Sequence, residues 1–223
     1  MSRYKVSIAS IEPVTHDVMR IRTERPKGLD FTPGQATEIF LDKTGWENEG
    51  RPFTFTSLPD NDYVEFTIKC YKERQGVTNE IRKLRPADHL ILNDIFGAIA
   101  YKGEGVFIAG GAGVTPFISI IRSLEQRNEL GNNKLLFANK TESDIILKDE
   151  FDRLLGKNFV NILSEERVRR HAFGMITEDF IRSYVTDFTK PFYVCGPPPM
   201  IEAVESQLAN LNVDPDLIVK EEV

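Results

Sequence analysis

The chain has 223 residues, of which 41% are hydrophobic and 28% are charged, and its net charge is −6. These proportions are those of a globular protein and exclude a disordered one, and the negative charge argues against a nucleic-acid binder with a broadly basic face. Since no run of about 18 apolar residues occurs, we expect no membrane span. Residues 1–6 lack the apolar core of a secretory signal, so we expect a cytoplasmic protein.

The first hundred residues are predicted to form an antiparallel barrel or sandwich. Short runs rich in Val, Ile, Thr, Phe and Tyr alternate there with turns that contain Pro, Gly, Asp and Asn. About six strands at this spacing are typical of such all-β folds. The expected strands are 4–11, 18–23, 36–41, 53–56, 63–71 and 89–93, with one helix at 78–84.

After about residue 100 the pattern changes to strands that alternate with helices. This alternation is typical of a parallel sheet with helices on both faces. The expected strands are 106–109, 134–138, 159–163, 192–195 and 217–219, and the expected helices are 115–127, 143–155, 177–184 and 197–211. The sequence therefore predicts two domains, at residues 1–100 and 101–223.

The cysteines and histidines argue against a metal centre. Two cysteines, Cys70 and Cys195, are too few to ligate an iron–sulfur cluster alone or to form a disulfide framework. The histidines at positions 16, 89 and 171 show no metal-ligand spacing. Any redox chemistry in this chain therefore needs an organic cofactor.

A strand-like segment, Arg51-Pro-Phe-Thr54, carries three side chains that suit a flavin. Arg51 has a permanent forked charge for a pyrophosphate, Phe53 offers a flat apolar ring for an isoalloxazine, and Thr54 offers a hydroxyl. On a strand Arg51 and Phe53 share one face while Thr54 points to the other. The alternative is an edge strand with a solvated arginine and core phenylalanines.

Two further segments suit phosphate groups. Gly76 precedes a helix start at Thr78 and Asn79, where backbone amides and the helix dipole favour an anion. Gly110-Gly-Ala-Gly-Val-Thr-Pro116 follows a strand and opens a helix, so a phosphate can approach its backbone closely. The alternatives are ordinary helix capping by Thr78 and a tight turn without a ligand.

Cys195-Gly-Pro-Pro-Pro-Met200 also stands at a strand end before a helix. Ligands of open α/β sheets gather at the carboxyl ends of strands, where Gly111 and Cys195 are both expected. A cysteine is often only a small buried apolar residue. Its place beside a second phosphate-type turn favours a site.

Together these segments resemble the ferredoxin–NADP reductase superfamily, which includes flavodoxin reductases and NADH–cytochrome b5 reductases. Arg51-Pro-Phe-Thr54 matches the R-x-Y-[ST] motif, with Phe53 in the place of tyrosine. Gly111-Ala-Gly-Val-Thr-Pro116 matches G-x-G-x-x-P, and Cys195-Gly-Pro-Pro-Pro-Met200 matches C-G-x-x-x-M. The resemblance covers nearly the whole chain, and the three motifs in this order are highly specific.

The resemblance implies a Greek-key barrel that binds FAD, followed by an α/β parallel-sheet domain that binds NAD(P). It implies FAD contacts from Arg51, Pro52, Phe53, Thr54, Lys69, Tyr71, Gly76, Val77 and Thr78. It implies dinucleotide contacts from Gly111, Gly113, Thr115, Pro116, Lys140, Glu165, Cys195, Gly196, Pro197 and Met200. Thr54 and Cys195 are the side chains that we expect beside the reacting atoms.

The implied activity is that of an NAD(P)H-dependent flavin oxidoreductase. Hydride passes from the nicotinamide to FAD, and electrons then pass to a separate small carrier such as flavodoxin or ferredoxin. One alternative is a non-autonomous electron-relay or nucleotide-sensing flavoprotein subunit. Another is a binding protein without flavin, in which the motifs are only turns.

The coenzyme preference is predicted from the residue after Ser164. NADPH-specific relatives place a Ser-Arg pair there for the 2′-phosphate, whereas this chain has Glu165. A carboxylate repels that phosphate and can accept hydrogen bonds from a ribose hydroxyl, so we expect NADH to be favoured. Four nearby cations offer the alternative, a phosphate contact: Lys140, Arg167, Arg169 and Arg170.

Overall fold

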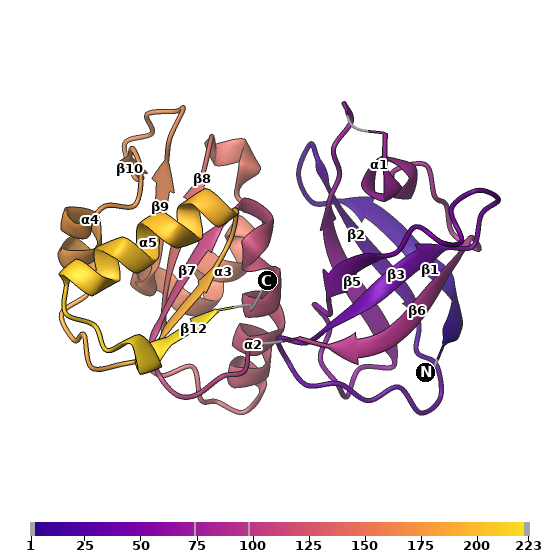
Figure 1. The fold of residues 1–223 in the computed structure, drawn as a ribbon, viewed down its shortest axis with the longest axis horizontal. Helices are drawn as coiled ribbons and strands as arrows, with labels where there is room; N and C mark the ends of the chain where they lie inside the picture. Colours follow the sequence, from indigo (N-terminus) through magenta and orange to yellow (C-terminus); the bar gives the residue numbers. More distant parts are fainter. Residues whose placement is uncertain (1–2, 74, 98, 221–223) are drawn as a thin grey trace. The chain divides into compact units, whose positions relative to one another are not determined.

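The computed structural model of the chain describes residues 3–73, 75–97 and 99–220 (Figure 1). It divides into two compact units. One unit comprises Met1–Ala98 and Thr115–Ser123, and the other comprises Ile99–Val114 and Leu124–Val223. The domain limits expected from the sequence, 1–100 and 101–223, stay a prediction.

The first unit is a nearly closed antiparallel barrel, as predicted. Its six strands follow the order β4-β3-β6-β1-β2-β5, and a bridge between Phe55 and Phe66 links the two ends of this order. A short helix, α1 (Val77–Ile81), lies at one end of the barrel (Figure 1). The strands are β1 (Tyr4–Pro13), β2 (Val18–Glu24), β3 (Ala36–Leu41), β4 (Arg51–Thr54), β5 (Tyr63–Lys69) and β6 (His89–Phe96).

Alternate residues of these strands fill the barrel, because successive side chains on a strand point to opposite faces. Val6 and Ile8 of β1 are buried, and so are Ile39 and Leu41 of β3. These side chains belong to one continuous core that also includes Phe55 and residues of β2, β5 and β6.

Strand β4 lies at the edge of its sheet, and Pro52 fits that position. Proline has no backbone N–H, so it is tolerated where one side of a strand lacks a partner. The expected strand, 53–56, is displaced in the structure: β4 ends at Thr54 because Phe55 already bridges to Phe66 of β5.

A buried carboxylate stabilises this unit. The Glu65 side chain is fully buried, and its two oxygens accept hydrogen bonds from Arg22 Nε at 2.9 Å, Arg122 Nη1 at 2.6 Å and Thr56 Oγ1 at 3.0 Å. Arg122 comes from the segment Thr115–Ser123, which groups with this unit. Burial alone raises the pKa of Glu65, but Arg122, Arg22 and Thr56 outweigh it and hold the pKa below its usual value.

The second unit is a six-stranded parallel sheet in the order β10-β9-β8-β7-β11-β12. Helix α5 (Pro198–Asn210) lies across one face of this sheet (Figure 1), where α5 and α4 (Glu178–Tyr184) share an apolar core with the strands. The strands are β7 (Val106–Gly110), β8 (Lys134–Asn139), β9 (Phe159–Leu163), β10 (Ala172–Phe173), β11 (Phe192–Cys195) and β12 (Ile218–Lys220). The other helices are α2 (Thr115–Gln126) and α3 (Lys148–Leu155).

The strand order reverses at β7. From β7 the chain proceeds outward through β8 and β9 to β10, and it then returns to place β11 and β12 on the other side of β7. Such a reversal leaves a crevice outside the carboxyl ends of the two central strands, which is where ligands of open α/β sheets bind. The expected parallel sheet is confirmed, and the point of reversal lies between β7 and β11.

Two elements of this unit differ from the expectation. Helix α3 begins at Lys148 and not at residue 143, because residues 142–144 form a separate turn capped by Thr141 and Leu147 has a φ of 52°. Strand β10 was not predicted, since two residues are too short for a periodic pattern. Among the described residues, no helix is both long and apolar enough to cross a membrane.

We predict that Glu65→Gln lowers the free energy of unfolding by about 3 kcal/mol at neutral pH, because two guanidinium groups lose their buried counter-charge. The lowered pKa also fixes the pH dependence. The carboxylate's contribution is complete above its unfolded pKa, about 4.3, and is lost as the pH falls through the lower folded pKa. The difference between variant and parent should therefore shrink in acid.

Urea unfolding at neutral pH and at decreasing pH measures both effects. Lys5→Met is the matched control, because it breaks an exposed ion pair with Asp42 in the same barrel. Equal stabilities of the Glu65→Gln variant and the parent at neutral pH would contradict the prediction.

Candidate functional site

The strand β4 presents an accessible cation. The Arg51 side chain is about half exposed (52%). Its Nη1 donates to the Gly50 carbonyl at 2.6 Å, and its Nη2 lies 3.6 Å from Glu49 Oε2. Phe53 is partly buried and packs against the barrel core, while Thr54 is partly buried and pairs with Ala36 of β3. Arg51 is therefore available to an anion, and Phe53 serves the core with part of its ring.

Lys69, the last residue of β5, and Tyr71, which follows the strand, were both expected to contact FAD, but their surroundings differ. Lys69 Nζ lies 2.9 Å from Asp17 Oδ2. Burial alone raises the pKa of Asp17, but its hydrogen bonds from Lys69 and Thr15 outweigh this and lower it. The Tyr71 ring is exposed. Lys69 therefore holds a protein carboxylate, whereas the expected ligand contact of Tyr71 stays a prediction.

The backbone at Gly76 does not require glycine, contrary to the reason given from the sequence. Its φ of 174° is extended, and a Cβ there would meet nothing within 4 Å. Gly76 itself is the N-cap of α1, and within the described chain no side chain caps it. The alternative interpretation, helix capping by Thr78, is therefore wrong. Val77 is buried, so it offers a ligand its backbone only.

In the second unit, two turns distant in sequence pack tightly against each other. A Cβ at Gly113 would overlap the backbone carbonyl of Cys195, and a Cβ at Gly110 would overlap the Met200 sulfur. Gly111 is different: it has a φ of 52°, and a Cβ there would meet nothing within 4 Å. Gly110 and Gly113 therefore permit packing, while Gly111 leaves room for a ligand.

The turn after β11 offers a ligand few backbone N–H donors. Cys195 ends β11 and is only 8% exposed. Pro197 is the N-cap of α5 and prolines follow it, so these positions have no backbone N–H. The Met200 N–H donates to the Pro197 carbonyl at 2.9 Å. A phosphate therefore has better partners at the turn that contains Gly111, Gly113, Thr115 and Pro116.

The carboxyl ends of β8 and β9 bring Lys140 and Glu165 together. Their side chains form an ion pair of 2.9 Å, and the hydrogen bond that Lys140 donates to Glu165 raises the pKa of Lys140. The other nearby cations are also engaged: the Arg167 guanidinium lies 3.8 Å from the centre of the Phe173 ring, and Arg170 pairs with Glu142.

Sequence reasoning missed Asn139, the last residue of β8. It is 8% exposed, and its Nδ2 is buried without a hydrogen-bond partner among the described residues. A buried unpaired donor at this edge of the sheet suits a hydroxyl or phosphate oxygen of a nucleotide.

Each unit thus carries residues that fit its expected cofactor. The first has a half-exposed arginine on β4, Arg51, and an exposed aromatic ring, that of Tyr71. The second has an open glycine at the strand reversal and an unpaired buried amide beside it. Such a barrel, followed by a doubly wound sheet with this crevice, defines the class of two-domain proteins that bind a flavin and a pyridine nucleotide.

Comparison with known proteins agrees with this class. Residues 3–94 match the family "FAD-binding domain", and residues 107–206 match "Oxidoreductase NAD-binding domain". The chain therefore belongs to the ferredoxin–NADP reductase superfamily, with FAD and a nicotinamide nucleotide as the cofactors of its two domains.

Three similar proteins illustrate the likeness. NADH-cytochrome b5 reductase 2 of Mycosarcoma maydis is 29% identical over 90% of this chain and 63% of its own length. The reductase component of propane 2-monooxygenase from Mycolicibacterium goodii is 29% identical over 89% and 61%. The structure of the CS-b5R domains of human Ncb5or, in its NAD+ form, has a TM-score of 0.86 at 26% identity and covers 99% of this chain and 70% of that one. The chain spans about three fifths of these two curated relatives.

We predict that Gly113→Ala lowers the free energy of unfolding by more than 2 kcal/mol, because the added methyl group forces the backbones of the two turns apart. Gly156→Ala is the control, since Gly156 has open space around it and the added methyl group meets no neighbour, although its φ of 51° adds backbone strain that Gly113 does not have. It should cost about 1 kcal/mol of backbone strain alone. Thermal unfolding measures both, and equal losses would contradict the packing argument.

Proposed function

We propose that this chain is an NAD(P)H-dependent flavin oxidoreductase that passes electrons to a separate protein acceptor. The observation that carries the proposal is the open Gly111 turn at the strand reversal, in a chain whose preceding barrel matches an FAD-binding domain. When bound, FAD supplies the redox chemistry, because it accepts a hydride from a reduced nicotinamide and releases electrons singly.

On the barrel, we assign Arg51 to the FAD pyrophosphate, Phe53 and Tyr71 to the flat and nucleotide parts, and Thr54 to a hydrogen bond near the reactive nitrogen. The half-exposed Arg51 guanidinium supports this, since a forked cation pairs well with phosphate oxygens. Further contacts are proposed for Pro52, Lys69, Gly76, Val77 and Thr78. The protein's contribution is to bind and orient the cofactor.

On the second unit, we assign the dinucleotide to Gly111, Gly113, Thr115 and Pro116, with Cys195 beside the nicotinamide. Cys195 and Gly113 are held against each other by backbone packing, which fixes where a ring could lie beside the sulfur. Gly196, Pro197 and Met200 complete that turn. Because Cys195 is mostly buried, its role is to shape the ring site and exclude water.

We further propose NADH as the preferred coenzyme. A 2′-phosphate at the end of β9 would meet the Glu165 carboxylate. This carboxylate already forms an ion pair with Lys140, the nearest cation named above. Arg167 and Arg170 are likewise engaged by Phe173 and Glu142. A ribose 2′-hydroxyl, in contrast, can donate to Glu165.

The acceptor is proposed to be a small one-electron protein, with flavodoxin or ferredoxin as the expected kinds. Two similar proteins are named for other acceptors, cytochrome b5 and a monooxygenase, and these are the next to test. We keep the cytoplasm as the proposed compartment, in accord with the two free thiols.

NADH oxidation with an artificial dye as acceptor tests the central proposal. Turnover by the flavin-loaded chain alone supports an autonomous reductase. Its absence, with the flavin bound, would favour the alternative of a relay or nucleotide-sensing subunit.

We predict that Arg51→Ala raises the Kd for FAD at least tenfold, because one charge-assisted contact to the pyrophosphate is lost. Flavin fluorescence titration of the apoprotein measures it. Lys5→Ala removes another exposed cation of the barrel and should leave the Kd unchanged. A variant that retains stoichiometric flavin with the parent's affinity counts against the assignment.

We predict that Glu165→Arg shifts the ratio of kcat/KM for NADPH over NADH upward by about tenfold, since a repelling charge becomes an attracting one. The same reversal at Glu129, an exposed residue paired with Arg127, is the control and should not move the ratio. Steady-state kinetics with both coenzymes decides, and an unmoved ratio in the Glu165 variant defeats the proposed role.

A further inference from the structure

Helix α2 is divided between the two units of the chain. Its residues Thr115–Ser123 group with the barrel, whereas Leu124 and the residues that follow it group with the second unit. The turn Gly111–Val114, which directly precedes α2, also groups with the second unit. A contact that holds the first part of α2 on the barrel therefore also holds one end of this glycine turn.

One arginine of α2 makes such a contact. Arg122 Nη1 donates to Glu65 Oε1 at 2.6 Å and to the Thr56 carbonyl at 2.7 Å. The Arg122 side chain is 16% exposed, and the Glu65 side chain is fully buried. Breaking a buried ion pair is costly, because the charge that remains has no compensation. The pair therefore anchors α2 strongly.

The same arginine contacts the segment that follows β4. Thr56 comes two residues after Thr54, the residue proposed beside the reactive flavin nitrogen. Thr56 is itself held by Glu65, since its Oγ1 donates to Glu65 Oε1 at 3.0 Å and its N–H donates to the Glu65 carbonyl at 2.8 Å. Arg122 thus connects the end of the proposed flavin segment with the helix that follows the proposed nucleotide turn.

A second contact of α2 supports the first. The Gly34 N–H donates to Ser119 Oγ at 3.1 Å, and both residues are buried. Residues three apart on a helix are neighbours on its surface. Ser119 and Arg122 therefore attach the same side of α2 to the barrel at two points.

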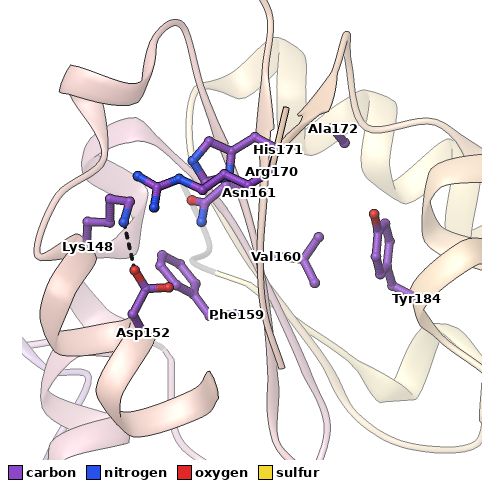
Figure 2. A pocket seen from close by; sticks show the side chains of 9 residues that line it. All are labelled: Lys148, Asp152, Phe159, Val160, Asn161, Arg170, His171, Ala172 and Tyr184. Carbon is purple, nitrogen blue, oxygen red and sulfur yellow. Dashed lines mark hydrogen bonds and ion pairs between the residues drawn. The ribbon is translucent and has the colours of Figure 1, made fainter. Parts of the chain in front are cut away.

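An ion pair beside β9 shows the contrast (Figure 2). Lys148 Nζ lies 2.8 Å from Asp152 Oδ2, but both residues belong to α3, and the Asp152 side chain is half exposed. Pairs of this kind contribute little to stability. Glu65 and Arg122, in contrast, are buried and lie 57 residues apart in the sequence. Lys148→Met is therefore a suitable control for the loss of a charge alone.

We propose that Arg122 is a positioning residue for hydride transfer, a role that rests on the function proposed above. A hydride, which is a hydrogen with two electrons, leaves the nicotinamide ring and joins the bound flavin, so the nucleotide is oxidised as the flavin is reduced. The rate depends steeply on placement, since a shift of about 1 Å can cost roughly a hundredfold. By anchoring the start of α2, Arg122 restricts how far the Gly111 turn can move from β4.

Amide hydrogen exchange of the protein without cofactors tests the anchor itself. We expect Arg122→Met to speed exchange in residues 111–122 about tenfold, because α2 opens more easily without its charged contact. Ser119→Ala should speed it about threefold, and its folding is not in question because only one hydroxyl is removed. Lys148→Met should leave exchange in these residues as in the parent.

Stopped-flow reduction of the FAD-loaded protein by NADH tests the role in the reaction. Arg122→Met should lower the limiting rate of flavin reduction about tenfold. The Kd for NADH should stay within about twofold of the parent's, because the proposed nucleotide residues are unchanged. Arg122→Lys, which keeps the charge, should recover part of the rate. Leu92→Ala, which loosens the barrel core on β6 but leaves Arg122 and Glu65 in place, should keep the parent's rate.

The outcomes separate this inference from the function on which it rests. No reduction by NADH in the flavin-loaded parent overturns the proposed function, and this role with it. A parent that reacts, with an Arg122→Met variant that reacts equally fast, overturns the positioning role alone. An equal loss of rate in Leu92→Ala does so too, because Arg122 would then only stabilise the fold. Unchanged hydrogen exchange in residues 111–122 also overturns it.

Discussion

The contact between Gly113 and the Cys195 carbonyl is the constraint on which the second unit depends. The reversal of strand order puts β7 and β11 side by side, so the turns that follow them must share one small space. Only a residue without a Cβ lets the two backbones approach so closely. The two turns stand at the carboxyl ends of β7 and β11, which is where ligands of open α/β sheets bind.

This constraint separates glycines that look equivalent in the sequence. Gly110 and Gly113 are required by the neighbouring turn, whereas Gly111 faces open space with a positive φ. The prolines after Cys195 also serve packing. They fix the backbone of the turn after β11, whereas the turn after β7 supplies the backbone amides. A motif that seems to be entirely about phosphate is thus largely about packing.

Much of the fold could be predicted from residue patterns, since strongly apolar runs bounded by turns define strands well. The expected ranges 159–163 and 192–195 coincide with β9 and β11. Features set by distant contacts could not be predicted. Strand β10 is too short for a pattern, and α3 starts late because a capped turn precedes it.

The candidate site shows the same division. Residue chemistry singled out Arg51 and the glycine-rich turns, whose ligand contacts stay a prediction, and it gave the wrong reason for Gly76, whose backbone is extended. It also could not foresee that Asp17 engages Lys69, or that Asn139 Nδ2 lacks a hydrogen-bond partner among the described residues, because both depend on which strands become neighbours.

The place of Pro52 on β4 has a consequence for how copies of this chain behave in solution. The barrel closes between β4 and β5 through the bridge at Phe55, so in the described part of the chain the outer edge of β4 from Arg51 to Thr54 pairs with no strand. Open edges invite strand addition and aggregation. Proline in the middle of this strand removes a donor from that edge, and the charged Arg51 stands next to it, so the seam resists pairing with another molecule.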